Sequence, residues 1–223
     1  MPGEFRLRGI PFTRLSADRV FFRYLPVMTF EEIASRMRQY RVGIAGCGGL
    51  GSNCAVALAR IGIGTLVIAD FDIVTEGNLN RQYYFTDQVG RKKTEALKEN
   101  LARINPRVKV VAHDVKLTEG NLPDIFAGCD VLVEAFDLAD QKLLLIETAQ
   151  SVYPDMPLVT GLGMAGWGDN ASIHCRKAGN IFICGDETSE IGPDLPPLAP
   201  RVGMVANMQA NVVTEILLGQ GSA

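Results

Sequence analysis

Histidine and paired cysteine are scarce in this chain of 223 residues, and each scarcity argues against a class of site. The two histidines, His113 and His174, lie in no metal-binding or catalytic pattern, so we expect structural or exposed roles for both. The five cysteines form no Cys-x-x-Cys pair, which argues against a four-cysteine zinc site. Their odd number and scattered positions argue against a disulfide framework and indicate a reducing compartment.

Long hydrophobic runs and an excess of one charge are missing as well. No uninterrupted apolar run is long enough to span a bilayer, and the formal net charge is only -3. This balance provides no basic field for nucleic acid or anionic lipid, so we expect neither nucleic acid nor a membrane as a partner. Apolar residues make up 47% and charged residues 21%, as in ordinary globular proteins. The sequence therefore predicts a soluble, cytoplasmic protein that holds any phosphate locally.

Short apolar runs alternate with helical patterns along most of the chain. The runs that read as strands are residues 41–45, 65–69, 108–112, 131–134 and 158–161. The helical patterns are residues 50–61, 89–104, 138–152 and 202–218. Strands that are apolar throughout are typical of a parallel sheet covered on both faces, and its crossovers are right-handed. The alternation predicts an α/β fold with a Rossmann-like, doubly wound, mainly parallel sheet and helices on both faces.

The N-terminal part departs from this alternation. Residues 1–40 are predicted to form an arm followed by a short helix, and residues 41–223 to form the main domain. Thr29 and Glu32 are spaced as a capping box, which predicts a helix that continues to about Gln39.

The C-terminal part departs from it too. Residues 171–175 and 180–184 read as a short antiparallel extension, a hairpin that turns near residues 177–179. Residues 185–200 are rich in proline, aspartate and glycine, which predicts a long irregular loop of the kind that is often functional. Cys184 precedes this loop and is the best candidate for a reactive thiol, although a small buried apolar residue is the commoner role.

A glycine-rich turn followed by an acidic strand end is the most informative motif. Gly46, Gly48, Gly49 and Gly51 follow a strand and open a helix, so their amides can meet a phosphate or a ribose. The alternative is a tight turn that simply needs small residues. Asp70 ends the next strand, where a carboxylate can accept both ribose hydroxyls, although a lone acid there is often just solvated. Together they favour a nucleotide, without separating a dinucleotide from ATP.

Polar residues beyond Asp70 point toward a triphosphate. Asn78, Arg81 and Gln82 follow the strand's carboxyl edge, where ligands of open α/β sheets bind. An arginine fork matches phosphate oxygens, and an asparagine amide can donate to another, although an isolated arginine is more often in a surface salt bridge. Lys93 lies near the start of the helical pattern at 89–104, where an ammonium and the helix dipole both favour an anion. The run 91–93 could equally be an exposed basic turn.

A further carboxylate suggests a metal ion. Asp137 follows the strand at 131–134, so we expect it at the same sheet edge as Asp70. A carboxylate beside a triphosphate is repelled unless a cation lies between them, and Mg²⁺ binds through one or two carboxylates plus phosphates. The alternative is a helix N-cap, a role that Asp140 could share.

These motifs together resemble the ThiF/MoeB/HesA family, adenylyltransferases related to ubiquitin-activating enzymes. The resemblance runs from about Tyr40 to the C-terminal helix. Its most specific parts are GCGGLGS (46–52), DFDIVTEGNLNRQ (70–82), the helix from Lys93 to Asn105-Pro106, and EAFD (134–137). The chain is most similar to the short, zinc-free, ThiF-like branch of thiazole biosynthesis, as EAFD, GLGMAGWG (161–168) and PPLAPRV (196–202) suggest.

The resemblance implies an ATP-dependent enzyme that adenylylates the C-terminal glycine of a small ubiquitin-like sulfur carrier ending in Gly-Gly, in thiamine biosynthesis. It places the ribose on Asp70, the Mg²⁺ on Asp137, and phosphates on Asn78, Arg81 and Lys93. The residues it implies around the nucleotide are Gly46, Gly48, Gly49, Gly51, Asp70, Asp72, Asn78, Arg81, Gln82 and Lys93. It casts Arg81, Lys93 and Asp137 as catalytic, and it implies a homodimer.

The chain departs from the family pattern in two respects. The family's Cys-x-x-Cys zinc ligands are missing, so no zinc is expected. The family usually has an Arg-Tyr-x-Arg-Gln segment whose arginine enters the neighbouring subunit's site. In this chain only Arg23-Tyr24 resembles it, and weakly.

Two other functions stay open. An NAD-dependent Rossmann oxidoreductase would use the glycine turn and Asp70, but it leaves Asn78, Arg81, Lys93 and Asp137 unexplained. A non-catalytic carrier-binding adaptor would not need the phosphate and metal residues to be intact.

Overall fold

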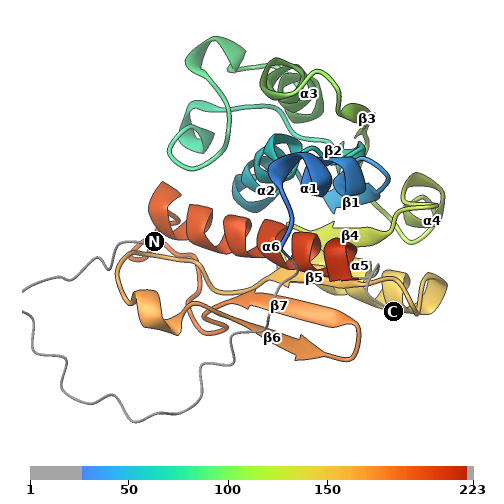
Figure 1. Ribbon diagram of the computed structural model, residues 1–223. Coiled ribbons are helices and arrows are strands. Elements are labelled where there is room, and N and C mark those ends of the chain that lie inside the picture. The colour runs from blue at the N-terminus through green and yellow to red at the C-terminus, as the bar shows by residue number, and fades with distance from the viewer. Residues whose placement is uncertain (1–26, 220–223) are drawn as a thin grey trace, which may run out of the picture.

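Residues 27–219, which the computed structural model describes, build a seven-stranded sheet with helices on both faces (Figure 1). The strands are β1 (Arg41–Ala45), β2 (Thr65–Asp70), β3 (Lys109–Asp114), β4 (Val131–Glu134), β5 (Leu158–Gly161), β6 (His174–Ala178) and β7 (Ile181–Gly185). Their order across the sheet is β3-β2-β1-β4-β5-β7-β6, and every neighbouring pair is parallel except β6 and β7. The predicted fold class is confirmed.

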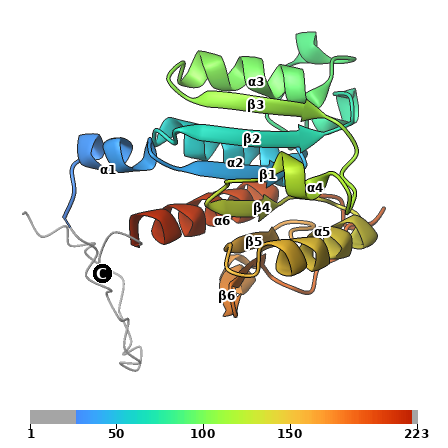
Figure 2. The ribbon, with the colours of Figure 1, turned by 90° about the vertical axis from the view of Figure 1, so that its right-hand side faces the viewer.

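Helices cover the two faces unequally. They are α1 (Phe30–Met37), α2 (Gly49–Arg60), α3 (Lys93–Ile104), α4 (Leu122–Ile125), α5 (Ala139–Val152) and α6 (Ala199–Gly219). One core layer joins α2, α3 and α6 to strand residues such as Val42 and Ile44. The other joins α4 and α5 to Ala45 and Leu132. Because strand side chains alternate between faces, β1–β5 and β7 contribute to both layers, whereas β6 is exposed along its length. The side view shows helices on both sides of the sheet (Figure 2).

The direction of the chain reverses across the sheet at β1. Ala45 at the end of β1 pairs with Ala69 of β2 on one side and with Glu134 of β4 on the other. The chain builds β2 and β3 outward from β1, then returns to place β4 on the opposite side. Ligands of open α/β sheets bind in the crevice beyond the carboxyl ends of the strands at such a switch point. The β1–β4 end is therefore where a functional site is expected.

Near the N-terminus the structure agrees with the predicted helix and capping box. Glu32 N donates to Thr29 Oγ1 at 3.2 Å, and Thr29 N donates to Glu32 Oε2 at 2.7 Å. The helix ends at Met37, two residues before the predicted Gln39. Arg23 and Tyr24, like most of the predicted arm, lie outside the described residues. No helix within residues 27–219 is long and apolar enough to cross a membrane.

The helix predicted over residues 89–104 begins four residues late, at Lys93. Gly90 has φ 88°, a left-handed conformation that does not continue a helix. Lys92 then forms an antiparallel bridge with Ile73, which draws residues 91–92 toward the segment after β2. Helical periodicity in the sequence did not reveal this long-range pairing.

The hairpin near the C-terminus differs from its prediction in register and in role. Its first strand is His174–Ala178 instead of residues 171–175, because residues 170–172 form a 3₁₀ turn and Gly179, with φ 63°, makes the reversal. β7 is also part of the parallel sheet, since it pairs in parallel with β5. Only β6 is an antiparallel extension.

The irregular loop is shorter than predicted. α6 begins at Ala199 instead of residue 202 and includes Gly219. Pro200 lies in its first turn, where a missing N–H costs no helical hydrogen bond. The loop that leaves β7 therefore spans residues 186–198.

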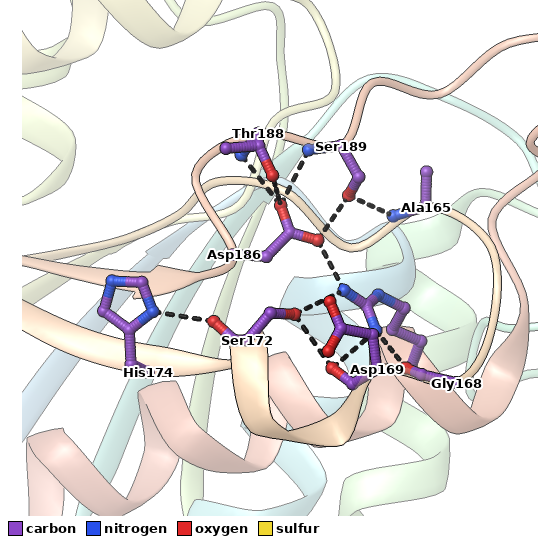
Figure 3. A network of polar contacts seen from close by, with 9 residues as sticks. Ala165, Gly168, Asp169, Ser172, His174, Asp186, Thr188 and Ser189 are labelled. Atoms are coloured by element: carbon purple, nitrogen blue, oxygen red, sulfur yellow. Dashed lines mark hydrogen bonds and ion pairs between the residues drawn. The ribbon is translucent and has the colours of Figure 1, made fainter.

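A buried ion pair anchors both ends of this loop (Figure 3). Asp186 Oδ2 accepts from Arg201 Nη2 at 2.5 Å and from Ser189 Oγ at 2.6 Å. Asp186 Oδ1 accepts from the backbone N–H of Thr188 at 2.8 Å and of Ser189 at 2.7 Å. Arg201, from the first turn of α6, also donates to Ser172 Oγ at 3.1 Å. The end of β7, the start of α6 and the 3₁₀ turn are thus fastened together.

Burial alone would raise the pKa of the Asp186 carboxyl. The hydrogen bonds from Ser189, Arg201 and Thr188 outweigh that effect and hold this pKa well below its usual range. The carboxylate is therefore charged and fully partnered at neutral pH, and it counters the guanidinium of Arg201.

We expect Asp186→Ala to lower the free energy of unfolding by about 3–5 kcal/mol, because it leaves the Arg201 guanidinium buried without a counter-charge. Asp194→Ala is the matched control, since Asp194 is exposed on the same loop. That substitution should change stability by no more than about 0.5 kcal/mol in urea unfolding. Equal effects of the two substitutions would contradict the anchoring role.

The same carboxyl should make stability depend on acid pH. Its folded pKa lies below the unfolded value of about 3.9, so its stabilising contribution is complete above that unfolded value. The contribution is lost as pH falls from there through the folded pKa. The stability difference between wild type and Asp186→Ala should thus be constant from about pH 5 to 7 and shrink below about pH 4. Urea unfolding at several pH values measures it, and a difference unchanged by acid would refute the assignment.

Candidate nucleotide-binding site

Two glycines of the turn between β1 and α2 are required by packing. A Cβ at Gly51 would lie 1.9 Å from the Gly46 carbonyl oxygen, and a Cβ at Gly46 would lie 2.8 Å from the Ala135 carbonyl oxygen. Gly46 also has φ 97°, a conformation that favours glycine. These contacts bring the start of α2 directly over the ends of β1 and β4.

Packing does not require glycine at position 48 and requires it less strictly at position 49 than at 46 and 51. A Cβ at Gly48 would meet only Gln82 Nε2, at an ordinary 3.7 Å, and one at Gly49 would press on the Val202 side chain at 2.9 Å. Within residues 27–219, the backbone N–H groups of Gly49 and Leu50 make no hydrogen bond. Gln82 Oε1 is buried there without a hydrogen-bond partner as well. The turn thus retains free donors and a free acceptor, which a merely tight turn does not require.

Asp70 lies at the end of β2, as predicted, and its carboxylate is tied to the turn. Its Oδ2 accepts from Cys47 N at 2.6 Å and its Oδ1 from Asp72 N at 2.8 Å. Each carboxylate oxygen has a further lone pair. Asp70 can therefore hold the turn in shape and still accept a hydrogen bond from a ligand hydroxyl.

The two neighbouring lysines at the start of α3 have different surroundings. The buried Lys93 ammonium lies 2.7 Å from Asp72 Oδ2, whose carboxylate is half exposed. The Lys93 backbone also donates to the Asp72 carbonyl at 3.0 Å. Lys92 instead pairs with Asp114 on β3 at 3.2 Å, and both side chains are more than 40% exposed. Lys93 thus belongs to the segment that follows β2, whereas Lys92 lies over the outer strand.

Asn78 caps the segment after β2, and Arg81 lies beside the glycine turn. Asn78 Oδ1 accepts from Thr75 N at 3.0 Å, which caps the 3₁₀ helix Glu76–Asn78. Arg81 Nη1 donates to Asn80 Oδ1 at 2.8 Å, and its Cγ lies 3.5 Å from a Cβ built at Gly49. The stem of Arg81 therefore runs along the glycine turn.

Asp137 follows β4 at the same edge of the sheet and is exposed. The N-cap of α5 is Leu138, so Asp137 does not cap that helix. The structure gives Asp137 no hydrogen bond or ion pair with any other residue in 27–219. A carboxylate in this position is available to a cation.

A buried acid beneath this edge was missed as a separate feature of the sequence. Glu134, the last residue of β4, is fully buried and lies 2.5 Å from the Lys142 ammonium. Thr160 donates to the same carboxylate oxygen, and Phe136 N donates to the other at 2.7 Å. Lys142 also donates to the Gly161 carbonyl at 2.9 Å. The only signal in the sequence was a glutamate that ends an apolar strand.

The cysteines nearest to the site are buried. Burial raises the pKa of the Cys47 thiol, and burial together with the neighbouring Cys175 raises that of Cys184. Both thiols are therefore mainly protonated at neutral pH, and the Cys184 side chain is part of the buried core.

The histidines form no metal or catalytic cluster in the described region. His174 is exposed and contacts Glu187 Oε1 at 3.2 Å. Within residues 27–219, no group of three His, Cys, Asp or Glu side chains is placed to hold a metal ion.

Comparison with known proteins assigns these motifs to a family. The family model described as "ThiF family" matches residues 23–223. The Sulfur carrier protein ThiS adenylyltransferase of Escherichia coli K12 is 30% identical over 229 residues, which cover 91% of this chain and 83% of that protein. The Adenylyltransferase and sulfurtransferase UBA4 of Meyerozyma guilliermondii is 34% identical over 227 residues, which cover 95% of this chain but 51% of that protein. The chain thus spans about half the length of the yeast relative.

Solved structures support the fold. The E. coli tRNA N6-threonylcarbamoyladenosine dehydratase TcdA, solved in complex with ATP, superposes with a TM-score of 0.78 at 22% identity. The match covers 86% of this chain and 91% of that one. Since the family model spans most of the chain and a relative matches it along most of both lengths, the chain belongs to the ThiF family.

Proposed function

We propose that this protein uses ATP to adenylylate the C-terminal glycine carboxylate of a small ubiquitin-like sulfur carrier ending in Gly-Gly, with release of pyrophosphate. The observation that carries the proposal is the set of free donors on the glycine turn, flanked by Asp70 and Lys93 where β1 and β4 end. Free amides at a helix N-terminus favour phosphate, and a carboxylate beside them favours ribose hydroxyls.

In this proposal the nucleotide lies across the glycine turn. Asp70 accepts from the ribose, and Gly46, Gly48, Gly49 and Gly51 let the backbone approach the phosphates. The phosphate ligands are Asn78, Arg81, Gln82 and Lys93, and Asp72 orients the Lys93 ammonium through their 2.7 Å contact. That ammonium has three donors, so the contact with Asp72 leaves others for phosphate. The ATP in the TcdA structure and the name of the E. coli relative support a nucleoside triphosphate as substrate.

The chemistry needs no general base, because a carboxylate is already an anion at neutral pH. One carboxylate oxygen of the carrier forms a bond to the α-phosphorus as the bond from that phosphorus to the pyrophosphate oxygen breaks. Arg81 and Lys93 then act as catalytic residues by countering charge that builds up on the α-phosphoryl group and on the leaving pyrophosphate. Fixed positions supply the remainder of the rate enhancement.

Asp137 is the residue that would hold Mg²⁺. Its carboxylate is exposed at the strand ends and has no partner among the described residues, which suits an ion that binds through one or two carboxylates plus phosphates. When bound, the ion neutralises triphosphate charge that would otherwise repel Asp137. No zinc ligand set is proposed.

The proposed carrier is a protein of the ThiS kind. The E. coli relative is named for the carrier ThiS, which supports a role in thiamine biosynthesis in the cytoplasm. The loop 186–198 leaves the same sheet edge, so it is positioned to guide an extended carrier tail. The active form is proposed to be a homodimer, as the family resemblance implies.

The direct test is exchange of labelled pyrophosphate into ATP, measured with purified ubiquitin-like carriers. Exchange should require the carrier, and a carrier that lacks its last glycine should not support it. Exchange with no carrier present, or none with any Gly-Gly carrier although ATP binds, would contradict the proposed reaction. The second result would favour a non-catalytic adaptor.

We expect Lys93→Ala to slow carrier-dependent exchange by about a hundredfold or more, because an ammonium that counters transition-state charge is lost. Lys92→Ala is the matched control, since its exposed pair with Asp114 lies over the outer strand. That variant should stay within about threefold of wild type, as expected where only a surface ion pair is lost. Equal losses would show that the basic run acts as a general electrostatic patch.

Asp137→Asn should raise the Mg²⁺ concentration needed for half-maximal exchange by about tenfold or more, since it removes a charged ligand. Asp140→Asn is the control, because Asp140 is an exposed carboxylate three residues away on α5. A magnesium titration of the exchange rate measures both variants. An unchanged magnesium requirement in Asp137→Asn would remove Asp137 from the metal site.

A further inference from the structure

Two cysteines face each other across the hairpin at the edge of the sheet. In the antiparallel pairing of β6 and β7, Cys175 is directly opposite Cys184. Residues that are opposite in an antiparallel pair carry their side chains on the same face of the sheet. Cys175 is exposed, whereas Cys184 is fully buried, and both are free thiols. The proposed adenylylation uses neither of them.

The hydrogen-bond pattern shows which kind of pair they form. The carbonyl of Cys184 accepts from Leu162 N at 2.8 Å, on the β5 side of β7. The carbonyl of Asn180, just before β7, likewise accepts from Leu158 N at 3.0 Å. Even-numbered residues from Asn180 to Cys184 therefore direct their backbone groups toward β5. Cys184 therefore has no backbone groups left for β6, and Cys175–Cys184 is a non-hydrogen-bonded pair.

The kind of pair determines the Cα separation, and therefore whether the two sulfurs can form a disulfide. Opposite residues in a non-hydrogen-bonded pair have Cα atoms about 4.5 Å apart, closer than in the hydrogen-bonded kind. Disulfides span Cα separations of about 4.4–6.8 Å. The two strands therefore already hold the cysteines at a separation that a disulfide accepts, without a backbone shift.

We propose that Cys175 and Cys184 are a redox modification site, which closes reversibly into a cross-strand disulfide by exchange with an external low-molecular-weight disulfide. The exposed Cys175 thiolate attacks one sulfur of the external disulfide and releases the first external thiol. Cys184 then loses its proton and attacks the Cys175 sulfur of the mixed disulfide, which releases the second. Two protein thiols are oxidised, and one external disulfide is reduced to two thiols.

The surroundings of Cys184 determine the rate. Burial and the neighbouring Cys175 raise the pKa of the Cys184 thiol, so little thiolate is present at neutral pH. The second exchange step is then the slow one, because the thiolate is the attacking species. The mixed disulfide on Cys175 accumulates first, and its conversion to the internal disulfide accelerates as pH rises.

The pair lies next to the root of the loop 186–198. The next pair along the hairpin is His174 opposite Gly185, the last residue of β7. Asp186 follows Gly185 directly. Oxidation would therefore add a covalent bond beside the buried Asp186–Arg201 pair. This inference rests on the hairpin alone and holds whether or not the protein adenylylates a carrier.

The test is oxidation of the full chain in glutathione buffers of graded ratio, followed by peptide mapping without reduction. We expect a peptide pair linked through Cys175 and Cys184 in the native protein. The equilibrium constant for closing this bond should be about a hundredfold larger in the native protein than in urea, because folding has already closed a loop of roughly ten residues. A constant no larger in the native chain than in urea would overturn the proposal.

Single variants identify the atoms involved. Cys184→Ala should stop at the glutathione adduct on Cys175, and Cys175→Ser should form neither product. Cys129→Ser is the matched control, since Cys129 lies outside the hairpin, and it should oxidise like wild type. A native chain that yields only the Cys175 adduct, a bridge to Cys129 or a bridge between two chains would refute the proposal. The peptide map of the wild-type protein decides this even where a variant fails to fold.

Discussion

The close contact between Gly51 and the carbonyl of Gly46 is the constraint on which the candidate site depends. A Cβ at Gly51 would lie 1.9 Å from that oxygen, so the first turn of α2 can press directly onto the end of β1. Gly46 in turn lies against Ala135, which follows β4. The N-terminus of α2 is thereby fixed over the point where the order of strands reverses. Its partial positive charge is directed at the crevice where ligands of such sheets bind.

Some polar groups around this crevice have hydrogen-bond or ion-pair partners in the protein, and others have none. Asp70 is held by two backbone amides, Asp72 by Lys93 and the buried Glu134 by Lys142. These pairings keep the acids at the strand ends from repelling an incoming anion. Among the described residues that line this crevice, the amides at the start of α2, Gln82 Oε1 and Asp137 have no partner. Free amides suit the phosphate groups of a nucleotide, and the free Asp137 carboxylate suits a cation bound to them.

The sequence predicted those parts of the site that follow from local pattern. The glycine spacing, the acid at the end of β2 and the alternation of strands and helices are local patterns, so they were predictable from residues 41–82 and the segments after them. Arg81 and Asn78 were predictable because they follow a strand end. Their neighbours in space, such as Gly49 beside the Arg81 stem, were not.

What the sequence could not predict depends on long-range contacts. Local pattern does not distinguish Lys92 from Lys93. The family resemblance selected Lys93, and the structure separates the two by their partners, Asp114 and Asp72. The late start of α3 results from a bridge to Ile73, nineteen positions before Lys92. The Asp186–Arg201 pair likewise joins a loop to a helix through tertiary packing. None of these contacts has a periodic signature.

The choice of nucleotide decides the proposed function, because a glycine turn with an acid at the next strand end would equally suit a dinucleotide. Titration calorimetry of the wild-type protein with Mg²⁺·ATP and with NADH tests it most directly. We expect Mg²⁺·ATP to bind with one molecule per chain and NADH neither to bind nor to displace it. Binding of NADH at the same site, with no binding of ATP, would contradict it.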